Sequence, residues 1–314
     1  MNFQIKPGAR KFESFGGELF PGIHGGSELI NLEKLYLMLF LKTIARQLVR
    51  ASLSLIFVRS ESIPIMAGPL KGRCLPKAEA LSNLSMLFGR YEPQVVSVLL
   101  SMSNPIKVAY DIGAHLGFIT LVLAERASSE GKVFAFEPAP ENIAVMQRLI
   151  IQNNLQHKVS LIPIALAHEN GEQNLINWKS SSMHFLESAL NGQKVCDCSS
   201  TYVTTCTLDS FVFEQLNPPP DLIKIDVEGA EALVIQGGLR TLDVYSPKLI
   251  IEIHGPNKAQ KTWSLLQSFD YSWNHLTAYG QEEVSSEEKL LSFFSKDSWT
   301  HHFLLIRQQN TRKS

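Results

Sequence analysis

Two glycines and two acidic residues form the pattern in this sequence that most clearly points to chemistry. Asp111, Gly113 and Gly117 have the spacing DxGxxxG, and Glu137 follows Gly117 by 20 residues. A glycine turn before a helix lets the backbone approach a ligand, and an acid at the end of the next strand can accept both hydroxyls of a ribose. The pattern therefore predicts a site for an adenosyl group.

The adenosyl compound could be a dinucleotide or S-adenosylmethionine. A pyrophosphate usually needs the backbone cradle GxGxxG, whereas His115 and Leu116 stand where the middle glycine would be. S-adenosylmethionine has no phosphate, and Asp111 would suit its ammonium group or the water around it. An NAD-dependent oxidoreductase is the alternative. We predict that S-adenosylmethionine binds through Asp111, Gly113, Ala114, His115, Gly117, Glu137, Pro138 and Asp226.

Polar residues also alternate along two later apolar runs. Lys224, Asp226 and Glu228 stand at every second position of one run, as do Glu252 and His254 in the next. Alternate residues of a strand share a face, and buried charges need partners. We expect Lys224 to pair with Asp226 or Glu252. Glu228 and His254 should lie nearer the acceptor, at the carboxyl edge where open α/β sheets bind ligands.

Methyl transfer from a sulfonium is an in-line displacement, so alignment of the two reactants supplies much of the catalysis. A hydroxyl acceptor must also lose its proton. His254 is our first candidate for the base, because its ordinary pKa is about 6.5, and Asp226 and Glu228 are the second candidates. In the alternative interpretation His254 bonds local backbone and the two acids stabilise the N-terminus of the next helix.

Metal binding is considered at two places, and we predict none. Asp226 and Glu228, with either Glu252 or His254, could hold magnesium, which prefers oxygen ligands, but the counter-charge of Lys224 argues against it. A zinc site from His184 and the three cysteines at positions 196, 198 and 206 lacks the usual paired CxxC spacing.

The segments around these motifs alternate between short apolar runs and helical patterns, which favours a parallel sheet covered on both faces. Residues 171–207 predict an insertion at one sheet edge, and residues 301–307 with 268–273 predict a closing hairpin at the other. We expect strands at residues 107–112, 132–137, 159–165, 221–226 and 248–254, and helices at residues 118–126, 138–153, 229–237 and 262–269.

The N-terminal third differs from this core. Residues 1–33 are rich in glycine, and we expect an arm without an assigned function. The apolar stretch 32–57 contains four basic residues, too many for crossing about 30 Å of hydrocarbon, so it predicts an amphipathic helix. We favour a helix that packs on the core and turns a basic face to solvent. In the alternative, residues 34–58 lie on an anionic membrane surface.

The composition restricts the class of protein. With 314 residues, of which 45% are apolar and 19% charged, the chain can bury a full-sized core and is not disordered or a disulfide scaffold. A formal net charge of -1 excludes the global positive field of a dedicated nucleic-acid binder. Four cysteines and the lack of a signal-peptide pattern lead us to expect a reduced, cytoplasmic protein. We leave the oligomeric state open.

Three segments resemble the FkbM family of S-adenosylmethionine-dependent methyltransferases. They are VAYDIGAHLGFITLVLA (108–124), GKVFAFEPAPEN (131–142) and LIKIDVEGAEALVIQGG (222–238), and the likeness covers roughly residues 65–255. The resemblance implies a Rossmann-like class I methyltransferase, usually acting on a hydroxyl of a sugar, polyketide or other secondary metabolite. His115 stands where the family commonly has asparagine.

The expected fold is therefore α/β, with a mostly parallel Rossmann-like sheet, an antiparallel edge strand and an N-terminal helical extension. We expect an arm and helix at residues 1–60, a helical cap at 61–104 and the methyltransferase domain at 105–308. The expected partner is a small-molecule or glycan acceptor. An N-methyltransferase, or a non-catalytic module that docks a partner or membrane, remains an alternative.

Overall fold

The computed structural model describes residues 26–178, 184–190, 198–295 and 298–307. The chain divides into two compact units, Met1–Val58 and Arg59–Ser314. The first 25 residues of the predicted N-terminal arm lie outside the described residues.

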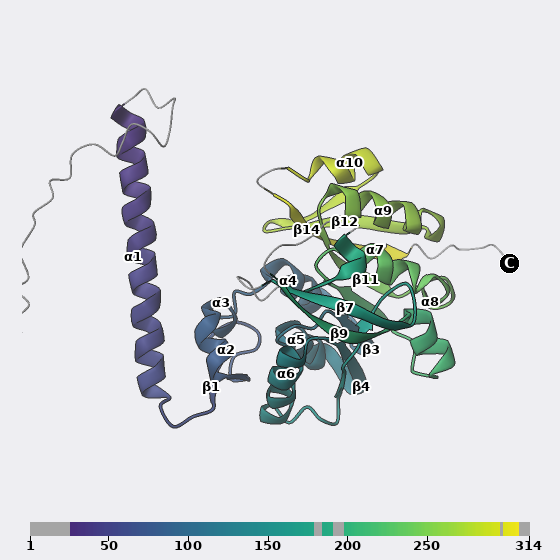
Figure 1. Cartoon of the computed structure of the whole chain (residues 1–314), viewed down its shortest axis with the longest axis horizontal. Helices are drawn as coiled ribbons and strands as arrows, with labels where there is room; N and C mark the ends of the chain where they lie inside the picture. Colours follow the sequence, from purple (N-terminus) through teal and green to yellow (C-terminus); the bar gives the residue numbers. More distant parts are fainter. Residues whose placement is uncertain (1–25, 179–183, 191–197, 296–297, 308–314) are drawn as a thin grey trace, which may run out of the picture. The chain divides into compact units, whose positions relative to one another are not determined.

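The first unit contains the helix α1 (Gly26–Ile56), which covers the predicted amphipathic segment (Figure 1). It has no glycine or proline after Gly26 and is rich in leucine, so it suits a long helix. All side chains at residues 37–52 are exposed, apolar ones included. The packing of this helix on the core, which we favoured, stays a prediction. No helix in the described part of the chain is both long enough and apolar enough to cross a membrane.

The second unit is built on an eight-stranded sheet with the order β13-β12-β14-β11-β10-β3-β4-β5. Neighbouring strands from β11 to β5 are parallel, and the pairs beyond β11 are antiparallel. The strands are β3 (Ile106–Ile112), β4 (Ala127–Phe136), β5 (Val159–Ile162), β10 (Leu222–Ile225), β11 (Lys248–His254), β12 (Tyr271–Thr277), β13 (Gly280–Val284) and β14 (Thr300–Arg307). The predicted α/β fold with its Rossmann-like sheet is confirmed.

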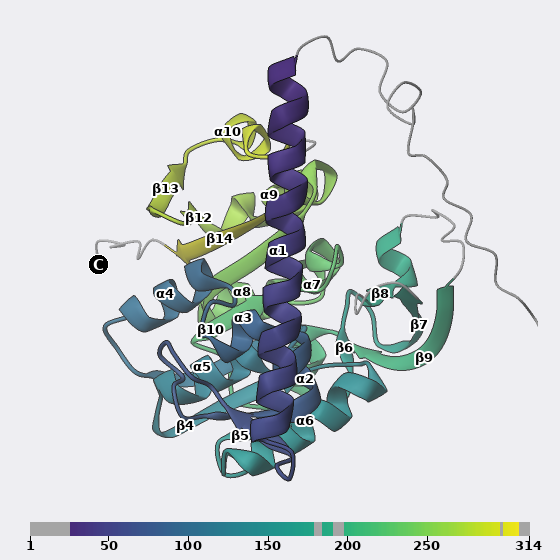
Figure 2. The ribbon, with the colours of Figure 1, turned by 90° about the vertical axis from the view of Figure 1, so that its left-hand side faces the viewer.

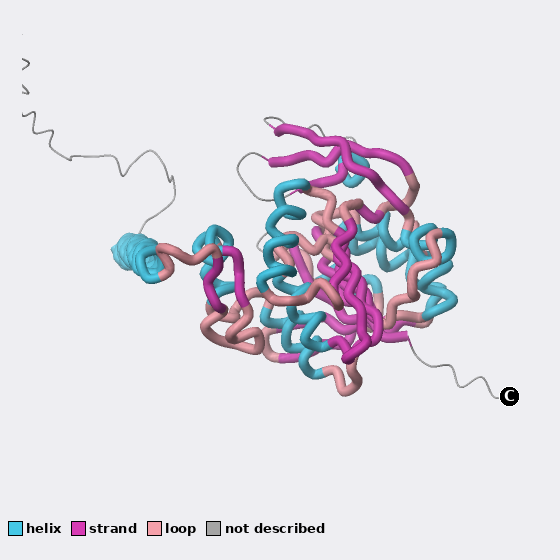
Figure 3. Tube along the Cα trace, turned by 90° about the horizontal axis from the view of Figure 1, so that it is seen from below, coloured by secondary structure: helices cyan, strands magenta, loops and turns pink. Residues whose placement is uncertain are grey.

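Helices lie on both sides of this sheet (Figure 3). Three of them begin with a proline, a residue favoured at the first helical position because it needs no hydrogen-bond partner for a backbone N–H. The helices are α2 (Lys77–Ser82), α3 (Leu84–Leu87), α4 (Pro93–Ser101), α5 (Phe118–Arg126), α6 (Pro140–Gln152), α7 (Glu231–Gln236), α8 (Leu239–Tyr245), α9 (Pro256–Leu266) and α10 (Glu287–Ser292).

The segment before β3 is tied to the core through α6. It contains a two-stranded sheet of β1 (Ser62–Pro64) and β2 (Cys74–Pro76), followed by α2 to α4. The side chain of Asn153 accepts a hydrogen bond from the backbone N–H of Cys74 and donates one to its carbonyl oxygen, both at 2.8 Å.

The predicted insertion forms a second sheet with the order β6-β9-β7-β8 (Figure 2). Its strands are β6 (Ala165–Leu166), β7 (Gly171–Trp178), β8 (His184–Leu186) and β9 (Cys198–Cys206). The predicted strand 159–165 is interrupted, because β5 ends before Pro163, which lacks a backbone N–H for the ladder. The chain then continues into β6 of the second sheet.

The other edge of the main sheet differs from the prediction. β12 and β14 do pair antiparallel, with Tyr271 opposite Arg307, but β14 lies between β11 and β12 instead of closing the edge. The edge strand is β13, which the sequence analysis missed because four of its five residues are exposed and it has no apolar pattern.

Four aromatic rings pack beneath the carboxyl ends of β3 and β4. Tyr110, Phe134, Phe136 and Phe211 have ring centroids 4.9 to 5.8 Å apart. The hydroxyl of Tyr110 donates to the carbonyl oxygen of Pro218 at 2.7 Å. Such edge-to-face contacts add to the stabilisation from burial, so the residues that follow these two strands start from a rigid base.

A substitution at Gly113 can test how closely the loops after β3 and β10 approach each other. It has φ +77°, and a Cβ there would lie 1.7 Å from the carbonyl oxygen of Asp226. We expect Gly113→Ala to lower the free energy of unfolding by about 2 to 4 kcal/mol, because backbone strain and overpacking add. Gly72→Ala is the control, since Gly72 has φ +91° but a Cβ added there would meet no atom within 4 Å. It should lower the free energy of unfolding by about 1 to 2 kcal/mol. Equal losses in urea unfolding would contradict the close approach.

Candidate active site

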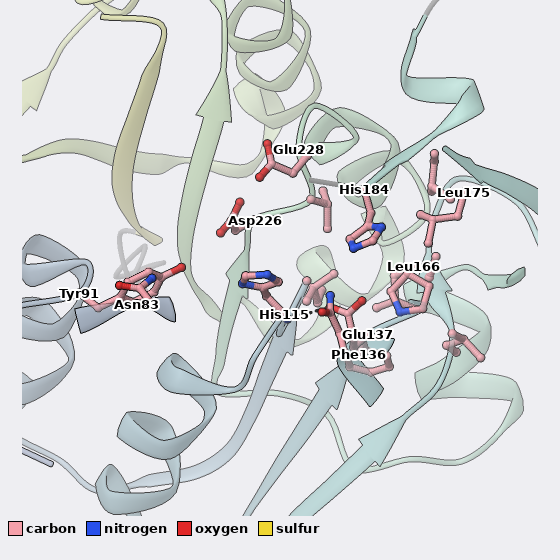
Figure 4. Close-up of a pocket in the computed structure, with 18 residues that line it drawn as sticks. Asn83, Tyr91, His115, Phe136, Glu137, Leu166, Leu175, His184, Asp226 and Glu228 are labelled. Carbon is pink, nitrogen blue, oxygen red and sulfur yellow. Dashed lines mark hydrogen bonds between the residues drawn. The ribbon is translucent and has the colours of Figure 1, made fainter. Parts of the chain in front are cut away.

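A cavity of about 280 Å³ opens beyond the carboxyl ends of β3, β4 and β10. Figure 4 shows Asp226 and Glu228 above His115 and Glu137 in this cavity. Its walls also include side chains from the segment before β3 and from the second sheet. These wall residues are Asn83, Tyr91, Leu175, His184 and Leu186.

Glu137 directly follows β4 and lines the cavity, although its residue is only 4% exposed. Its Oε2 accepts a hydrogen bond from the backbone N–H of His115 at 2.7 Å, and its Oε1 accepts one from Ala139 at 2.9 Å. Burial raises the pKa of Glu137 to about 7, although these bonds and Asn142 act against it. A carboxylate oxygen can accept two bonds, so Glu137 can still accept hydroxyl donors from a ligand.

His115 presents a neutral ring to the same cavity. Its backbone is left-handed, with φ +51°, and this conformation turns the N–H toward Glu137. Burial, aided by the charge of Lys224, lowers the pKa of His115 to about 4. Its buried Nε2 has no hydrogen-bond partner among the described residues. A ligand with hydrogen-bonding groups, such as S-adenosylmethionine, would satisfy this atom, so the residues present fit that cofactor.

Three predicted cofactor residues do not line the cavity. Asp111 is fully buried, accepts a 2.6 Å hydrogen bond from the hydroxyl of Thr120 on α5, and has its other oxygen 3.6 Å from Lys224 Nζ. Asp111 therefore takes a structural position beneath the loop instead of the predicted one at the ligand. Ala114 and Gly117 shape the turn before α5, where Gly117 donates to the carbonyl oxygen of Ala114 at 2.8 Å.

Lys224 holds the loops after β3 and β10 together. Its buried Nζ donates to the carbonyl oxygen of Gly113 at 3.1 Å and to Asp226 Oδ2 at 3.3 Å. Burial disfavours the charged amine, but Asp226, Asp111 and nearby glutamates outweigh it and raise the pKa of Lys224 well above its usual range. The predicted pairing of Lys224 with Asp226 is confirmed, whereas Glu252 pairs with His302.

His254 occupies a more enclosed position than predicted. Its Nδ1 lies 2.7 Å from Oε1 of the fully buried Glu231, and its Nε2 lies 3.2 Å from Glu228 Oε2. Burial alone would lower its pKa, but Glu231, Asp226 and Glu228 raise the pKa of His254 to about 9. At neutral pH both ring nitrogens are therefore protonated. His254 does not line the cavity and has no lone pair to take a proton, which disfavours our first candidate for the base.

Glu228 is better placed for that role. It lines the cavity, and its side chain is 31% exposed. β10 ends at Ile225, so the alternation that we extended to Glu228 stops there, and Glu228 has a left-handed backbone with φ +50°. Strained non-glycine residues of this kind cluster at functional sites. Burial raises the pKa of Glu228 to about 7, although His254 opposes this.

A second polar cluster beside Asp226 was not predicted as a unit. Glu252 on β11 pairs with His302 on β14, with 2.8 Å between Oε2 and Nε2. One carboxyl oxygen of Glu92 is buried without a partner among the described residues. Burial raises the pKa of Glu92 to about 7. The signal for His302 was its position in the last apolar run, but the strand register that brings it to Glu252 is not readable from sequence spacing.

Two sets of side chains bring possible metal ligands within 4.8 Å of one another: Glu92, Glu252 and His302, and Asp226, Glu228 and His254. The second set consists of residues from the two alternating runs of the sequence. Of the zinc candidates, Cys206 is buried, His184 bonds Asn177 at 2.8 Å, and Cys196 lies outside the described residues.

Comparison with known proteins gives the family. Residues 111–282, more than half of the chain, match the model of the methyltransferase FkbM domain. The hexuronic acid methyltransferase AglP of Haloferax volcanii is 26% identical over 276 residues, which cover 87% of this chain and 100% of AglP.

Solved structures with similar folds are more distant. The methyltransferase FkbM of Methylobacillus flagellatus has 18% identity and a TM-score of 0.41, and the match covers 70% of this chain but only 47% of that one, about half its length. An O-methyltransferase of Bacillus cereus in complex with SAH has 12% identity and a TM-score of 0.40, with coverages of 68% and 80%. The assignment rests on the sequence matches, not on these two structures. By those matches, the chain belongs to the FkbM family of S-adenosylmethionine-dependent methyltransferases.

Proposed function

We propose that this enzyme methylates a hydroxyl group of a sugar or a related small-molecule or glycan acceptor, with Glu228 as the base. The observation that carries the proposal is a partly exposed carboxylate with a pKa of about 7 on the wall of the cavity. A group with a pKa near the working pH suits general base catalysis. The hexuronic acid specificity of AglP supports a sugar acceptor.

S-adenosylmethionine, when bound, supplies a methyl group already activated by the sulfonium. Among the predicted cofactor contacts, Gly113, His115, Glu137, Pro138 and Asp226 line the cavity. We assign the ribose hydroxyls to Glu137 and a further hydrogen bond to His115 Nε2. The apolar side chains of Phe136, Ile164 and Leu166, which line the same cavity, supply a wall for the adenine ring.

The base is held by a chain of hydrogen-bonded and ion-paired groups. Glu231 fixes the ring of His254 through Nδ1, and the protonated Nε2 faces Glu228 Oε2 at 3.2 Å. The imidazolium stabilises the carboxylate form of Glu228 and orients it. In this proposal Glu228 takes the proton of the acceptor hydroxyl, while His254 and Glu231 act as positioning residues.

The role of Glu137 predicts a pH dependence of cofactor affinity. The carboxylate form accepts ribose hydroxyls, so affinity is full above a pKa of about 7 and falls as pH drops through it. Calorimetry should find S-adenosylmethionine bound about tenfold more weakly at pH about 6 than at pH about 8. Glu137→Gln should bind the donor more weakly by about 1 to 3 kcal/mol, and its affinity should no longer fall between pH about 8 and about 6 as that of the wild type does. Any titration of the donor itself affects both proteins equally, so it cancels when their pH dependences are compared. An identical pH dependence in the variant would reject the assignment.

The base is tested by Glu228→Gln. We expect the rate of label transfer from isotope-labelled donor into a cell extract of the native host to fall about 100-fold or more, with donor affinity unchanged. In the wild type, the rate should rise with pH through about 7 as Glu228 loses its proton. Glu172→Gln, on the exposed part of β7, is the matched control. An unchanged rate in Glu228→Gln, with nitrogen-methylated products by mass spectrometry, would instead support N-methylation.

We also propose that transfer needs no divalent metal. Asp226, Glu228 and Glu252 each lie within 3.3 Å of a nitrogen of a basic side chain, supplied by Lys224, His254 and His302. Treatment with a strong chelator should therefore leave the transfer rate unchanged. Loss of activity that magnesium or manganese restores would show that one of the two possible ligand sets holds an ion.

A further inference from the structure

We propose that α1 docks the protein on an anionic membrane surface, with the helix lying along the surface. Twelve large apolar side chains between residues 35 and 58 are exposed, and their exposed fractions reach 75% at Leu55. Folded proteins seldom expose so much apolar surface without a binding partner.

From residue 34 onward, the charges of α1 are all positive. Between residues 34 and 60 the sequence contains five basic residues and no acidic one, and the two acidic residues of α1, Glu28 and Glu33, both precede this stretch. Each lysine or arginine near a membrane is attracted by the negative lipids of its surface. The segment therefore complements an anionic lipid headgroup layer and not a basic partner.

The spacing separates most of the basic side chains from an apolar stripe. Leu37, Leu41, Ile44 and Leu48 follow one another at intervals of four, three and four residues, so they share one side of the helix. Lys42 and Arg46, spaced by four, lie on the opposite side. A helix of this kind buries its apolar side among lipid chains and extends its basic side chains to the headgroups.

A second copy of the helix is the main competing partner, because the same intervals suit a coiled-coil seam. Such a seam would cover only the narrow stripe. Leu35, Leu39 and Val49 are also exposed and lie outside it. These three side chains share the helix side of Lys42 and Arg46, so they do not decide between the two partners. The basic charges do, because they favour an anionic lipid surface over a second copy of the same positively charged segment.

The test uses flotation of the full chain with lipid vesicles. We expect the protein to bind vesicles of phosphatidylcholine with phosphatidylserine, to bind phosphatidylcholine alone much more weakly, and to dissociate as salt screens the charges. Absence of binding to both kinds of vesicle would overturn the proposal.

Matched variants separate the contributions of charge and apolar surface. Replacing Lys34, Lys42 and Arg46 by glutamine should weaken partition onto the anionic vesicles by about 100-fold. Replacing the exposed Lys71, Lys107 and Lys248 of the second unit by glutamine changes the net charge equally and should have little effect. Equal partition of these two triple variants would contradict docking through α1.

Leu41→Gln with Leu48→Gln should weaken binding to both kinds of vesicle. Helix content by circular dichroism and an unchanged donor affinity show that the variant is folded. The competing outcome is that the wild type does not bind vesicles and forms a dimer in analytical ultracentrifugation, which these two substitutions dissociate. That result would show that the partner of α1 is a second copy of the chain and not a membrane.

Discussion

The buried ammonium group of Lys224 is the interaction on which the geometry of the site depends. It joins the carbonyl oxygen of Gly113, at the start of the loop after β3, to the carboxylate of Asp226 after β10, and it faces the fully buried Asp111. Without this cation, the fully buried carboxylate of Asp111 would have no ion-pair partner, which is strongly destabilising. The same contact therefore supports the fold and sets the position of Asp226 in the cavity.

Asp226 and Glu228 have pKa values that are shifted in opposite directions. Burial acts against ionisation of Asp226, but Lys224 and two histidines hold its pKa below the usual range. For Glu228 burial is the largest effect, and nearby acids add to it, so its pKa rises to about 7 although His254 opposes this. Acids whose environments separate their pKa values can take separate roles. Asp226 stays ionised in the pH range where Glu228 can exchange a proton.

The sequence predicted those parts of the fold and site that depend on short-range order. The turn at Gly113, the acid after the next strand and the pair of Lys224 with Asp226 all follow from local spacing. The contacts of His254 with Glu231 and of Glu252 with His302 depend on how distant segments pack. No spacing rule fixes that packing. His254 thus looked like a free base in the sequence, although a buried acid holds it protonated.

The two sides of the cavity come from segments of different kinds. The side that we propose for the donor is made by the ends of β3, β4 and β10, whose motifs carry the family resemblance. The opposite walls come from Asn83 and Tyr91 before β3, and from Leu175, His184 and Leu186 on β7 and β8. Changes in those walls can alter the acceptor without disturbing Glu137 or Lys224. If the proposed function is right, the side chains of these walls select the acceptor, because the chemistry of a site and not the fold alone determines what an enzyme acts on.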